Sequence, residues 1–233
     1  RSNIRYTDGI ILCNQDFLTA HLQQIRGGQD GLINREADLI VVDEAHNLDD
    51  KVRSATTERV NQGMLLGLIE SAIKEVKAVN RQNLYGDVED AEKTIRAFFD
   101  CLKAQMQEQI THSQQDIRYA DRFFFKDSKD SLALLKAMIE SIQSVARSIQ
   151  IYSSIDYGSR STAASDELDS LSWSLAELIE QIDINLLWIE RKRNNAELVY
   201  CPNNTSQVTN RLYFSGKEKV ILTSATMTNA NNG

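Results

Sequence analysis

The chain has 233 residues, and its 26 Lys and Arg against 33 Asp and Glu give a formal net charge of −7. Hydrophobic residues make up 42% and charged residues 25%, which is typical of a globular protein and excludes a disordered or collagen-like chain. The acidic balance argues against a protein that coats nucleic acid by charge alone. We also expect no membrane partner, because no apolar run approaches the length of a membrane span and no leader pattern begins the sequence.

Glycine, proline and cysteine are all scarce. Ten Gly and one Pro in the whole chain predict long helices, because these two residues mark turns and the ends of strands. The three cysteines, Cys13, Cys101 and Cys201, have no short spacing, which excludes a disulfide framework or a zinc knuckle and favours an intracellular setting. The chain begins with Arg1, so we expect a fragment of a larger protein.

Three short apolar runs predict buried strands near the two ends of the chain. They cover residues 9–13, 38–42 and 220–223, and each is followed by polar residues. We expect Cys13 to pack in the first strand as a small apolar residue, and a helix to follow from Asp16 to Gly27. Because the runs are apolar on both faces and helical segments separate them, they indicate a parallel α/β sheet.

The middle of the chain predicts helices. Apolar residues recur at helical spacing in four stripes, over residues 59–80, 88–110, 132–149 and 168–186. Each stripe leaves one apolar face that a single helix cannot bury, so we predict that the four pack together. Residues 153–166 predict a polar connector, and the aromatic residues 123–125 predict a short strand or an irregular hydrophobic anchor.

Two acidic residues directly follow the second predicted strand. Asp43 and Glu44 would then lie at the carboxyl end of a parallel strand, where such sheets bind ligands. An Asp there can hold the hydrated Mg²⁺ of a nucleotide, and the adjacent Glu can orient or deprotonate an attacking water. An acidic loop without function would look the same, so this pair alone decides nothing.

The longer string Asp43-Glu44-Ala45-His46 resembles the DEAH box of superfamily-two helicases, and Thr223-Ser224-Ala225-Thr226 resembles their motif III. Asp43 and Ser224 are 181 positions apart, and a helical insertion of this size is similar to the arch domain of XPD/DinG-like DNA helicases. Asn47 and Leu48 fit the XPD-like extension of the box, whereas Ala225 is closer to the DinG branch. Asn14 matches a family segment ahead of the box, but Gln15 stands where that pattern has His.

The resemblance implies a mostly α fold, with a helical arch domain inserted into a partial RecA-like α/β motor domain. The implied divisions are 1–50 for motor domain 1, 51–212 for the arch and 213–233 for the return to the motor. Its implied activity is ATP-dependent translocation on single-stranded DNA and unwinding of forked duplex, in DNA repair. An arch that binds a regulatory protein, and a cytoplasmic location associated with the nucleoid in a bacterium, follow from the same resemblance.

The resemblance also implies roles for particular residues. Asp43 would hold Mg²⁺ through the ATP, Glu44 would activate water, and His46 would couple the nucleotide state to the rest of the motor. Motif III would supply the relay residues, which are Ser224, Ala225 and Thr226. Asn14 is a further candidate for a DNA contact.

Basic and aromatic residues give a second set of candidates for DNA binding. Arg191, Lys192 and Arg193 could contact a phosphate backbone, although we favour the solvated end of a helix. Arg122 and Lys126 belong to a similar series, and residues 123–125 could stack on bases. For these aromatic residues we favour a role in the core or in docking the arch.

The sequence contains no G-x-x-x-x-G-K-[ST] phosphate-binding motif, since Gly216-Lys217 is followed by Glu218. We therefore expect the fragment alone to be inactive as an ATPase. The ligands of an iron–sulfur cluster, if the parent protein has one, would lie outside this chain. The competing hypothesis is an arch-type module that docks protein or DNA, in a protein with a degenerate motor.

Overall fold

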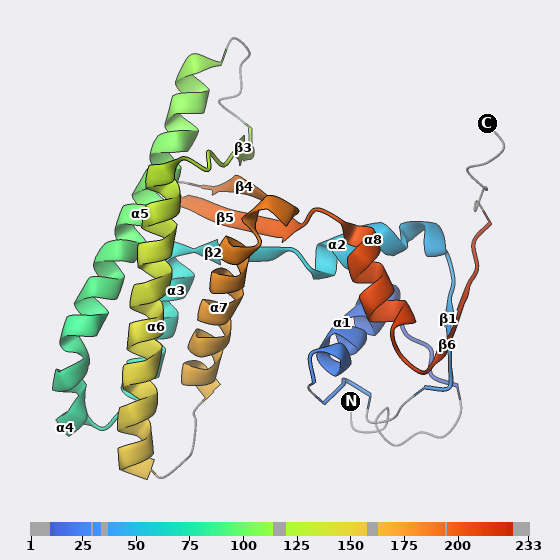
Figure 1. Ribbon diagram of the computed structural model, residues 1–233, viewed down its shortest axis with the longest axis horizontal. Coiled ribbons are helices and arrows are strands. Elements are labelled where there is room, and N and C mark those ends of the chain that lie inside the picture. Colours follow the sequence, from blue (N-terminus) through green and yellow to red (C-terminus); the bar gives the residue numbers. More distant parts are fainter. Residues whose placement is uncertain are drawn as a thin grey trace. The chain divides into compact units, whose positions relative to one another are not determined.

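The computed structural model describes residues 10–28, 30–33, 37–113, 120–157, 163–193 and 195–225. The chain divides into two compact units (Figure 1). Unit 1 combines Arg1–Thr57 with Cys201–Gly233, and unit 2 contains Glu58–Tyr200. Unit 2 is therefore inserted into the sequence of unit 1, and the described residues are mostly helical, with one small parallel and one antiparallel sheet.

Unit 1 is built on two parallel strands, β1 (Leu39–Val42) and β6 (Lys219–Leu222). The two apolar runs predicted as parallel strands at 38–42 and 220–223 are thus confirmed. The remaining elements of this unit are helical, namely α1 (Gln15–Arg26), the 3-10 helix η2 (Ala45–Asn47), α2 (Leu48–Ala55), α8 (Thr205–Thr209) and the π-helix η5 (Asn210–Phe214).

The core of unit 1 lies on one side of this sheet. Ile40 and Val42 of β1 are buried with residues of α1, α2, α8 and η5, which include Leu22, Val52 and Tyr213. The alternate residues of the strands, Leu39, Val41 and Ile221, are about half exposed. Parallel sheets are normally covered on both faces. Within the described residues, the sheet of unit 1 is covered on one face.

The prediction of a strand at residues 9–13 is wrong for residues 10–13, which the structure describes. Residues 10–14 form no strand, and the side chains of Ile10 and Leu12 are almost fully exposed. Cys13, expected to be packed, is exposed as well. The described sheet of unit 1 consists of β1 and β6, so no neighbouring strand pairs with the peptide groups of this apolar run.

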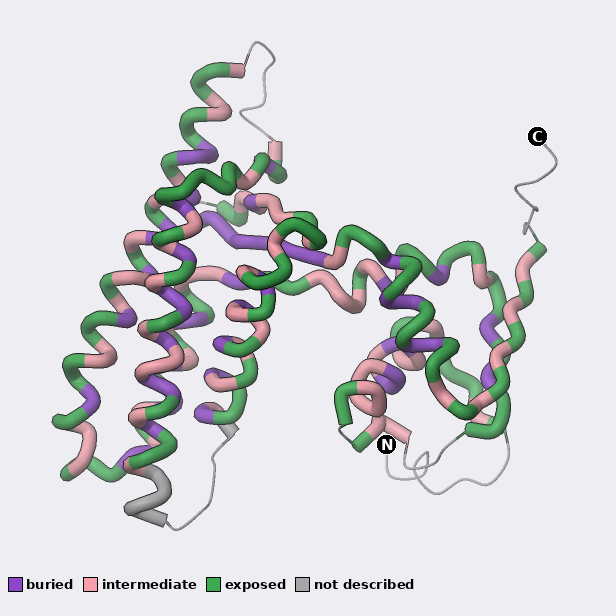
Figure 2. Tube along the Cα trace, in the orientation of Figure 1, coloured by how far each residue is buried: buried purple, intermediate pink, exposed green. Residues whose placement is uncertain are grey.

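Unit 2 contains the four predicted amphipathic helices. They are α3 (Gln62–Lys74), α5 (Tyr85–His112), α6 (Lys129–Tyr157) and α7 (Ala163–Glu180). Helix α6 packs against α5 and α7, and α7 packs against α3, with the buried residues of each helix turned toward its neighbours (Figure 2). Short helical segments complete the unit, namely α4 (Ala78–Arg81), η3 (Gln82–Leu84) and η4 (Ile182–Ile184).

A four-stranded antiparallel sheet also belongs to unit 2. Its strands are β2 (Glu58–Asn61), β3 (Arg122–Phe124), β4 (Asn185–Lys192) and β5 (Asn195–Pro202), in the order β2-β5-β4-β3. Glu58 at the start of β2 is the register partner of Tyr200 in β5. One face of the sheet packs on the helices through core residues such as Val60, Ile189 and Leu198.

Two predictions for the middle of the chain were wrong in extent. The helical stripe was extended to Leu186, which lies in β4, and Arg191 and Lys192 end that strand instead of ending a helix. The connector predicted at 153–166 is shorter, because α6 continues through Tyr157 and α7 begins at Ala163. Residues 158–162 lie outside the described residues. The sequence offers no proline or glycine to stop α6 before Gly158.

The core of unit 2 is continuous. Phe98 and Phe99 of α5 are fully buried, and their rings meet edge to face with centroids 5.4 Å apart. Of the aromatic residues 123–125, for which a core role was favoured, Phe123 belongs to this core and Phe125 packs against it, but Phe124 is 83% exposed because it points to the opposite face of β3. Among the described residues, no helix is both long and apolar enough to cross a membrane.

Candidate active site at the strand ends of unit 1

The carboxyl ends of β1 and β6 bring two distant segments together. Val42 and Leu222 are register partners at the end of the parallel ladder. The backbone pairing continues beyond the strands, because Thr223 N–H donates to the Val42 carbonyl (2.9 Å) and Ala45 N–H donates to the Thr223 carbonyl (2.9 Å). Residues 43–46 therefore lie beside residues 223 and 224.

Asp43 is held by hydrogen bonds to one of its carboxylate oxygens. Oδ1 accepts from the Thr223 hydroxyl at 2.8 Å and from the Glu44 backbone N–H at 2.9 Å. The Thr223 hydroxyl, with the Glu44 N–H, lowers the pKa of Asp43 below its ordinary value. Asp43 is thus an exposed carboxylate that stays ionised at neutral pH, and such an oxygen is a ligand that Mg²⁺ prefers.

Glu44 has a left-handed backbone, with φ 51° and ψ 45°. This conformation costs a non-glycine residue about 1–3 kcal/mol and persists only where neighbouring contacts impose it. Here the Glu44 carbonyl accepts from Asn47 N–H (3.0 Å) and from the Gln15 side chain (3.2 Å), while Ala45 is tied to Thr223. The chain turns sharply out of β1 into η2, which places the carboxylate of Glu44 beside His46.

His46 joins the two segments through a single ring nitrogen. Nδ1 lies 2.8 Å from Ser224 Oγ and 3.1 Å from Glu44 Oε2. The imidazole therefore contacts the acidic loop and the segment after β6 at the same time. A shift of the segment after β6 relative to the acidic loop would alter the contact of His46 with Ser224.

Gln15, at the first position of α1, forms hydrogen bonds to the backbone of the acidic loop. Its Nε2 donates to the Asp43 carbonyl at 2.5 Å and to the Glu44 carbonyl at 3.2 Å. Its Oε1 is buried and has no hydrogen-bond partner among the described residues. A buried amide oxygen without a partner is costly, so this position is suited to receive a donor.

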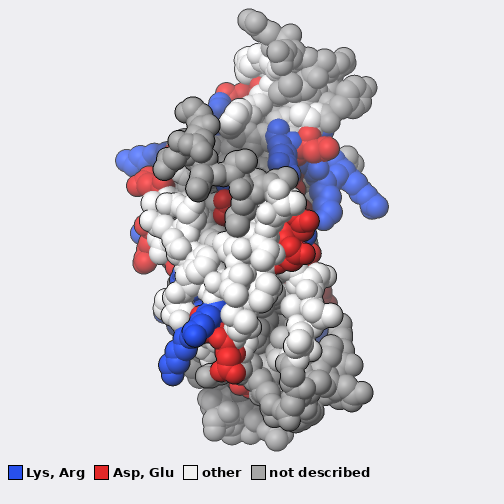
Figure 3. All heavy atoms as spheres, turned by 90° about the vertical axis from the view of Figure 1, so that its right-hand side faces the viewer, with Lys and Arg blue, Asp and Glu red and all other residues white. Residues whose placement is uncertain are grey.

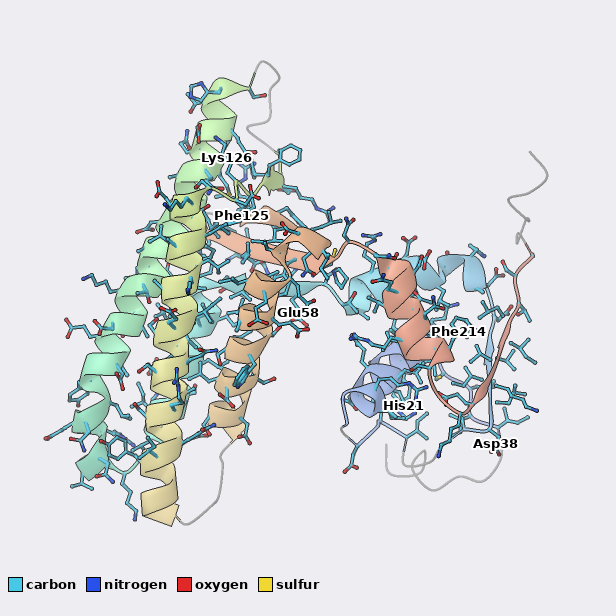
Figure 4. The ribbon with its side chains drawn as sticks, in the orientation of Figure 1. His21, Asp38, Glu58, Phe125, Lys126 and Phe214 are labelled. Atoms are coloured by element: carbon cyan, nitrogen blue, oxygen red, sulfur yellow. The ribbon has the colours of Figure 1, made fainter. Side chains whose placement is uncertain are left out.

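A hollow of about 1230 Å³ lies in unit 1 next to these residues. It is lined by residues 10–15 and 37–44, by part of α1 and by residues 215–218. His21 on α1, labelled in Figure 4 with Asp38 ahead of β1, also lines it. Burial lowers the pKa of His21, whose Nδ1 accepts from the Ile33 N–H at 3.3 Å. Lined by acidic and apolar residues together, the hollow can admit a group that reaches Asp43 and Glu44.

The other sequence candidates have different surroundings. Asn14 caps α1, because its Oδ1 accepts from the Phe17 N–H at 2.8 Å. Ala225 is exposed in a turn, and Thr226 lies outside the described residues. Arg191, Lys192 and Arg193 belong to unit 2, at the end of β4 and in the turn that follows.

Charge is mixed on the side of the molecule that Figure 3 shows, where acidic and basic side chains lie near one another around uncharged residues.

In the part of the chain that the structure describes, no group of three or more His, Cys, Asp or Glu side chains could hold a metal ion.

Comparison with known proteins gives one informative match. A probable ATP-dependent helicase of Bacillus subtilis (strain 168), YpvA, is 25% identical to the chain over 231 residues. The match covers 97% of this chain but 34% of the relative, so the chain spans about a third of the length of that relative. No known family profile matches the chain. The similarity supports a helicase-family relationship.

Sequence patterns did not identify two residues that contribute to this site. Thr223 was read as part of the strand, yet its hydroxyl is the side-chain partner of Asp43. Its place in the Thr-Ser-Ala-Thr string was the available signal. Gln15 was noted as a departure from the family pattern, and its contact with residues 43 and 44 crosses 28 positions that no local pattern could reveal.

Proposed function

We propose that the chain is part of an ATP-dependent DNA helicase of the XPD/DinG-like type, one that translocates on single-stranded DNA. The observation that supports this most is the hydrogen-bonded contact of residues 43–46 with residues 223 and 224, at the ends of two parallel strands. The helicase-family similarity runs through both segments, because it covers nearly the whole chain.

In this proposal Asp43 binds the hydrated Mg²⁺ of ATP, and Glu44 orients the attacking water and takes its proton. The Mg²⁺ would neutralise charge that develops on the phosphates. His46 lies between Glu44 and Ser224, so it would transmit a change at the acidic loop to the segment after β6. Glu44 is suited to its role because its backbone conformation is fixed by contacts on both sides.

The phosphate-binding loop would come from residues that are not in this sequence. We infer that the hollow beside Gln15 and Asp43 receives that part of a longer motor domain, and that helices of that domain cover the open face of the β1–β6 sheet. In the same proposal unit 2 is the arch, which would guide the strand and bind a regulatory protein. We place it at 58–200 because α2 and α8 pack with unit 1.

The decisive experiment measures DNA-stimulated ATP hydrolysis by the longer protein that contains this chain. Glu44→Gln keeps the size of the side chain but removes its basicity, so we expect kcat to fall at least about 100-fold. Glu70→Gln is the matched control, because Glu70 is exposed on α3 and pairs with Lys74. Equal activity of the two variants would contradict the proposal.

The 233-residue chain by itself should show no ATPase activity, because it has no phosphate-binding loop. Measurable DNA-stimulated hydrolysis by this chain would contradict the assignment of that loop to other residues. A longer protein without hydrolysis or a G-K-[ST] motif would instead support the alternative of a docking module with a degenerate motor.

A further inference from the structure

The sheet of unit 2 has one face packed on helices and an opposite face that carries aromatic and basic side chains. We call this opposite side the outer face and define it by residues Arg59, Arg122, Phe124, Trp188, Glu190 and Lys192. Side chains alternate along a strand, so Phe123 and Ile189 point into the core while their neighbours Phe124 and Trp188 point away from it. The contacts of Arg59 and Arg122 with Glu190 place these residues on the same side.

Phe124 and Trp188 form the centre of the outer face. They are register partners across β3 and β4, which puts their Cβ atoms about 5 Å apart. The Phe124 side chain is 83% exposed, although exposing a large aromatic ring to water is unfavourable. The indole of Trp188 is anchored, because its Nε1 donates to Glu190 Oε1 at 2.9 Å. Two adjacent aromatic side chains are therefore presented side by side.

The backbone that carries Phe124 is held in place by a helix. Gln109 of α5 donates from Nε2 to the Phe124 carbonyl (2.8 Å) and accepts the Phe124 N–H on Oε1 (3.0 Å). One turn earlier, Gln105 makes the same pair of bonds with the backbone of Lys126. The two glutamines act as a partner strand for the chain at and after β3, where Figure 4 labels Phe125 and Lys126. These hydrogen bonds hold the backbone at the exposed ring in a fixed position.

On the outer face the basic side chains are more exposed than the carboxylates with which they pair. The Glu190 side chain is only 19% exposed and pairs with Arg122 at 3.3 Å and with Arg59 at 3.6 Å. Arg122, which is 73% exposed, also lies over the Trp188 ring at 5.8 Å. Lys192 is similarly exposed and pairs with the buried Glu197 at 3.4 Å. Cations and aromatic rings therefore reach the solvent, while the carboxylates lie beneath them.

We propose that the outer face binds single-stranded nucleic acid, with Phe124 and Trp188 stacking on bases and Arg59, Arg122 and Lys192 contacting phosphates. Aromatic rings beside cations are the combination that binds single strands, because every base has a face to stack and every nucleotide a phosphate. A sheet surface can present such rings at the spacing of neighbouring bases. This inference stands on unit 2 alone and does not rest on the proposed ATP site.

The test uses the fluorescence of Trp188 in the 233-residue chain, without ATP. The chain has two tryptophans, so Trp173→Phe leaves Trp188 as the reporter. Titration with an oligo-dT of about 10 nucleotides, a length that a small domain can bind, should quench this fluorescence. Phe124→Ala should weaken binding roughly five- to a hundred-fold, the effect of losing one stacked base.

Three controls separate stacking from other contacts. Phe124→Leu keeps an apolar side chain without a ring, so it should bind as weakly as Phe124→Ala. Trp173→Ala removes an exposed aromatic from α7 and, measured by anisotropy of labelled oligo-dT, should bind like the unaltered chain. Circular dichroism checks that each variant is folded, which we expect because both side chains are exposed.

The phosphate contacts predict a dependence on salt. Arg122→Gln should reduce the slope of log affinity against log salt by about 0.7, the value for one phosphate contact on a single strand. Arg147→Gln on α6, which is exposed, should leave the slope unchanged. A duplex of the same length should bind more weakly, because its bases are already stacked.

Several outcomes would overturn the proposal. They are the absence of quenching by oligo-dT at low salt, equal binding of duplex and single strand, and equal affinities of Phe124→Ala and Trp173→Ala. Retention of oligo-dT affinity by Phe124→Leu would also overturn it, because binding would then not depend on stacking of the ring. None of these outcomes depends on ATP hydrolysis, so they are separate from a failure of Glu44→Gln.

Discussion

The two units differ in how completely each buries its own apolar residues. In unit 2, four helices and one face of the sheet enclose a continuous core, and the outer face carries charged side chains beside Phe124 and Trp188. In unit 1, the sheet has two strands in the described residues, and Leu39, Val41 and Ile221 remain about half exposed on one face. Unit 2 is built as a domain that is complete by itself, whereas unit 1 presents a surface suited to further packing.

The candidate active site and the open face of the sheet occur in the same unit. The candidate active site lies in unit 1, where Glu44 with its left-handed backbone contacts Gln15, whose buried amide oxygen has no partner among the described residues. Unit 2 also has a left-handed residue, Arg193, in the turn between β4 and β5, but its described part has no buried side-chain oxygen or nitrogen without a partner. The buried amide oxygen without a partner therefore occurs in the unit whose sheet has an open face.

The strongest test of this difference is a large cavity in the core of unit 2. Phe98→Ala removes a fully buried ring and should lower the free energy of unfolding by about 3–5 kcal/mol. Chemical denaturation followed by circular dichroism measures the loss, and hydrogen exchange should show it in α5 and α6 while β1 and β6 keep their protection. Phe124→Ala is the control and should cost less than about 0.5 kcal/mol. Equal loss of protection in both units would show that unit 2 is not complete by itself.

Alkaline pH should destabilise unit 2 through Tyr200. Burial raises the pKa of this tyrosine to about 12, although its hydroxyl lies 3.0 Å from Ser174 Oγ. The folded-state pKa lies above the unfolded value, so stability is complete below pH 10 and is lost as the pH rises toward 12. The loss should reach about 2 kcal/mol in urea titrations at high pH. Tyr200→Phe should remove this part of the pH dependence, and an unchanged profile would contradict it.

Acid should destabilise unit 1 through His21, with a smaller effect. Burial lowers its pKa, and Arg26 adds to the effect while Glu218 opposes it. The unfolded chain then binds a proton more readily than the folded one, so stability falls as the pH drops below about 6.5. Hydrogen exchange at β1 and β6 should accelerate over this range, and His21→Gln should abolish the acceleration. His112→Gln, at an exposed position of α5, should not, and an equal effect would exclude His21 as the cause.

Sequence patterns identified the elements that bury one regular face. The stripes of α5 and α6 and the apolar runs of β1 and β6 were predicted because burial repeats with a fixed period in each. Strands β4 and β5 were missed, since Leu186 continues the helical spacing of α7 and no glycine or proline marks the change. The apolar run from Ile10 to Cys13 was predicted as a strand but forms none. An apolar run becomes a strand only where another strand pairs with it.

For the candidate site, the sequence indicated that Asp43 and Glu44 follow one buried strand and that residues 224–226 follow another, and contact between the two segments was implied only by the family resemblance. The hydrogen bonds themselves could not be derived from a pattern. The choice of Thr223 over Ser224 as the partner of Asp43, and the reach of Gln15 beneath the loop, depend on exact backbone geometry. The functional roles of these residues stay predictions until the variants are measured.

The register of β2 and β5 has a consequence for how such a protein can be rearranged. Glu58 and Tyr200, the first and last residues of unit 2, are paired neighbours in one sheet. An insertion whose two ends meet can be removed or exchanged by bridging a gap of only a few residues. Joining Thr57 to Cys201 through a short glycine-containing turn would therefore give a shortened chain for engineering. The same geometry would let evolution gain, lose or replace the insert in a single event, without rebuilding the strands that carry the acidic loop.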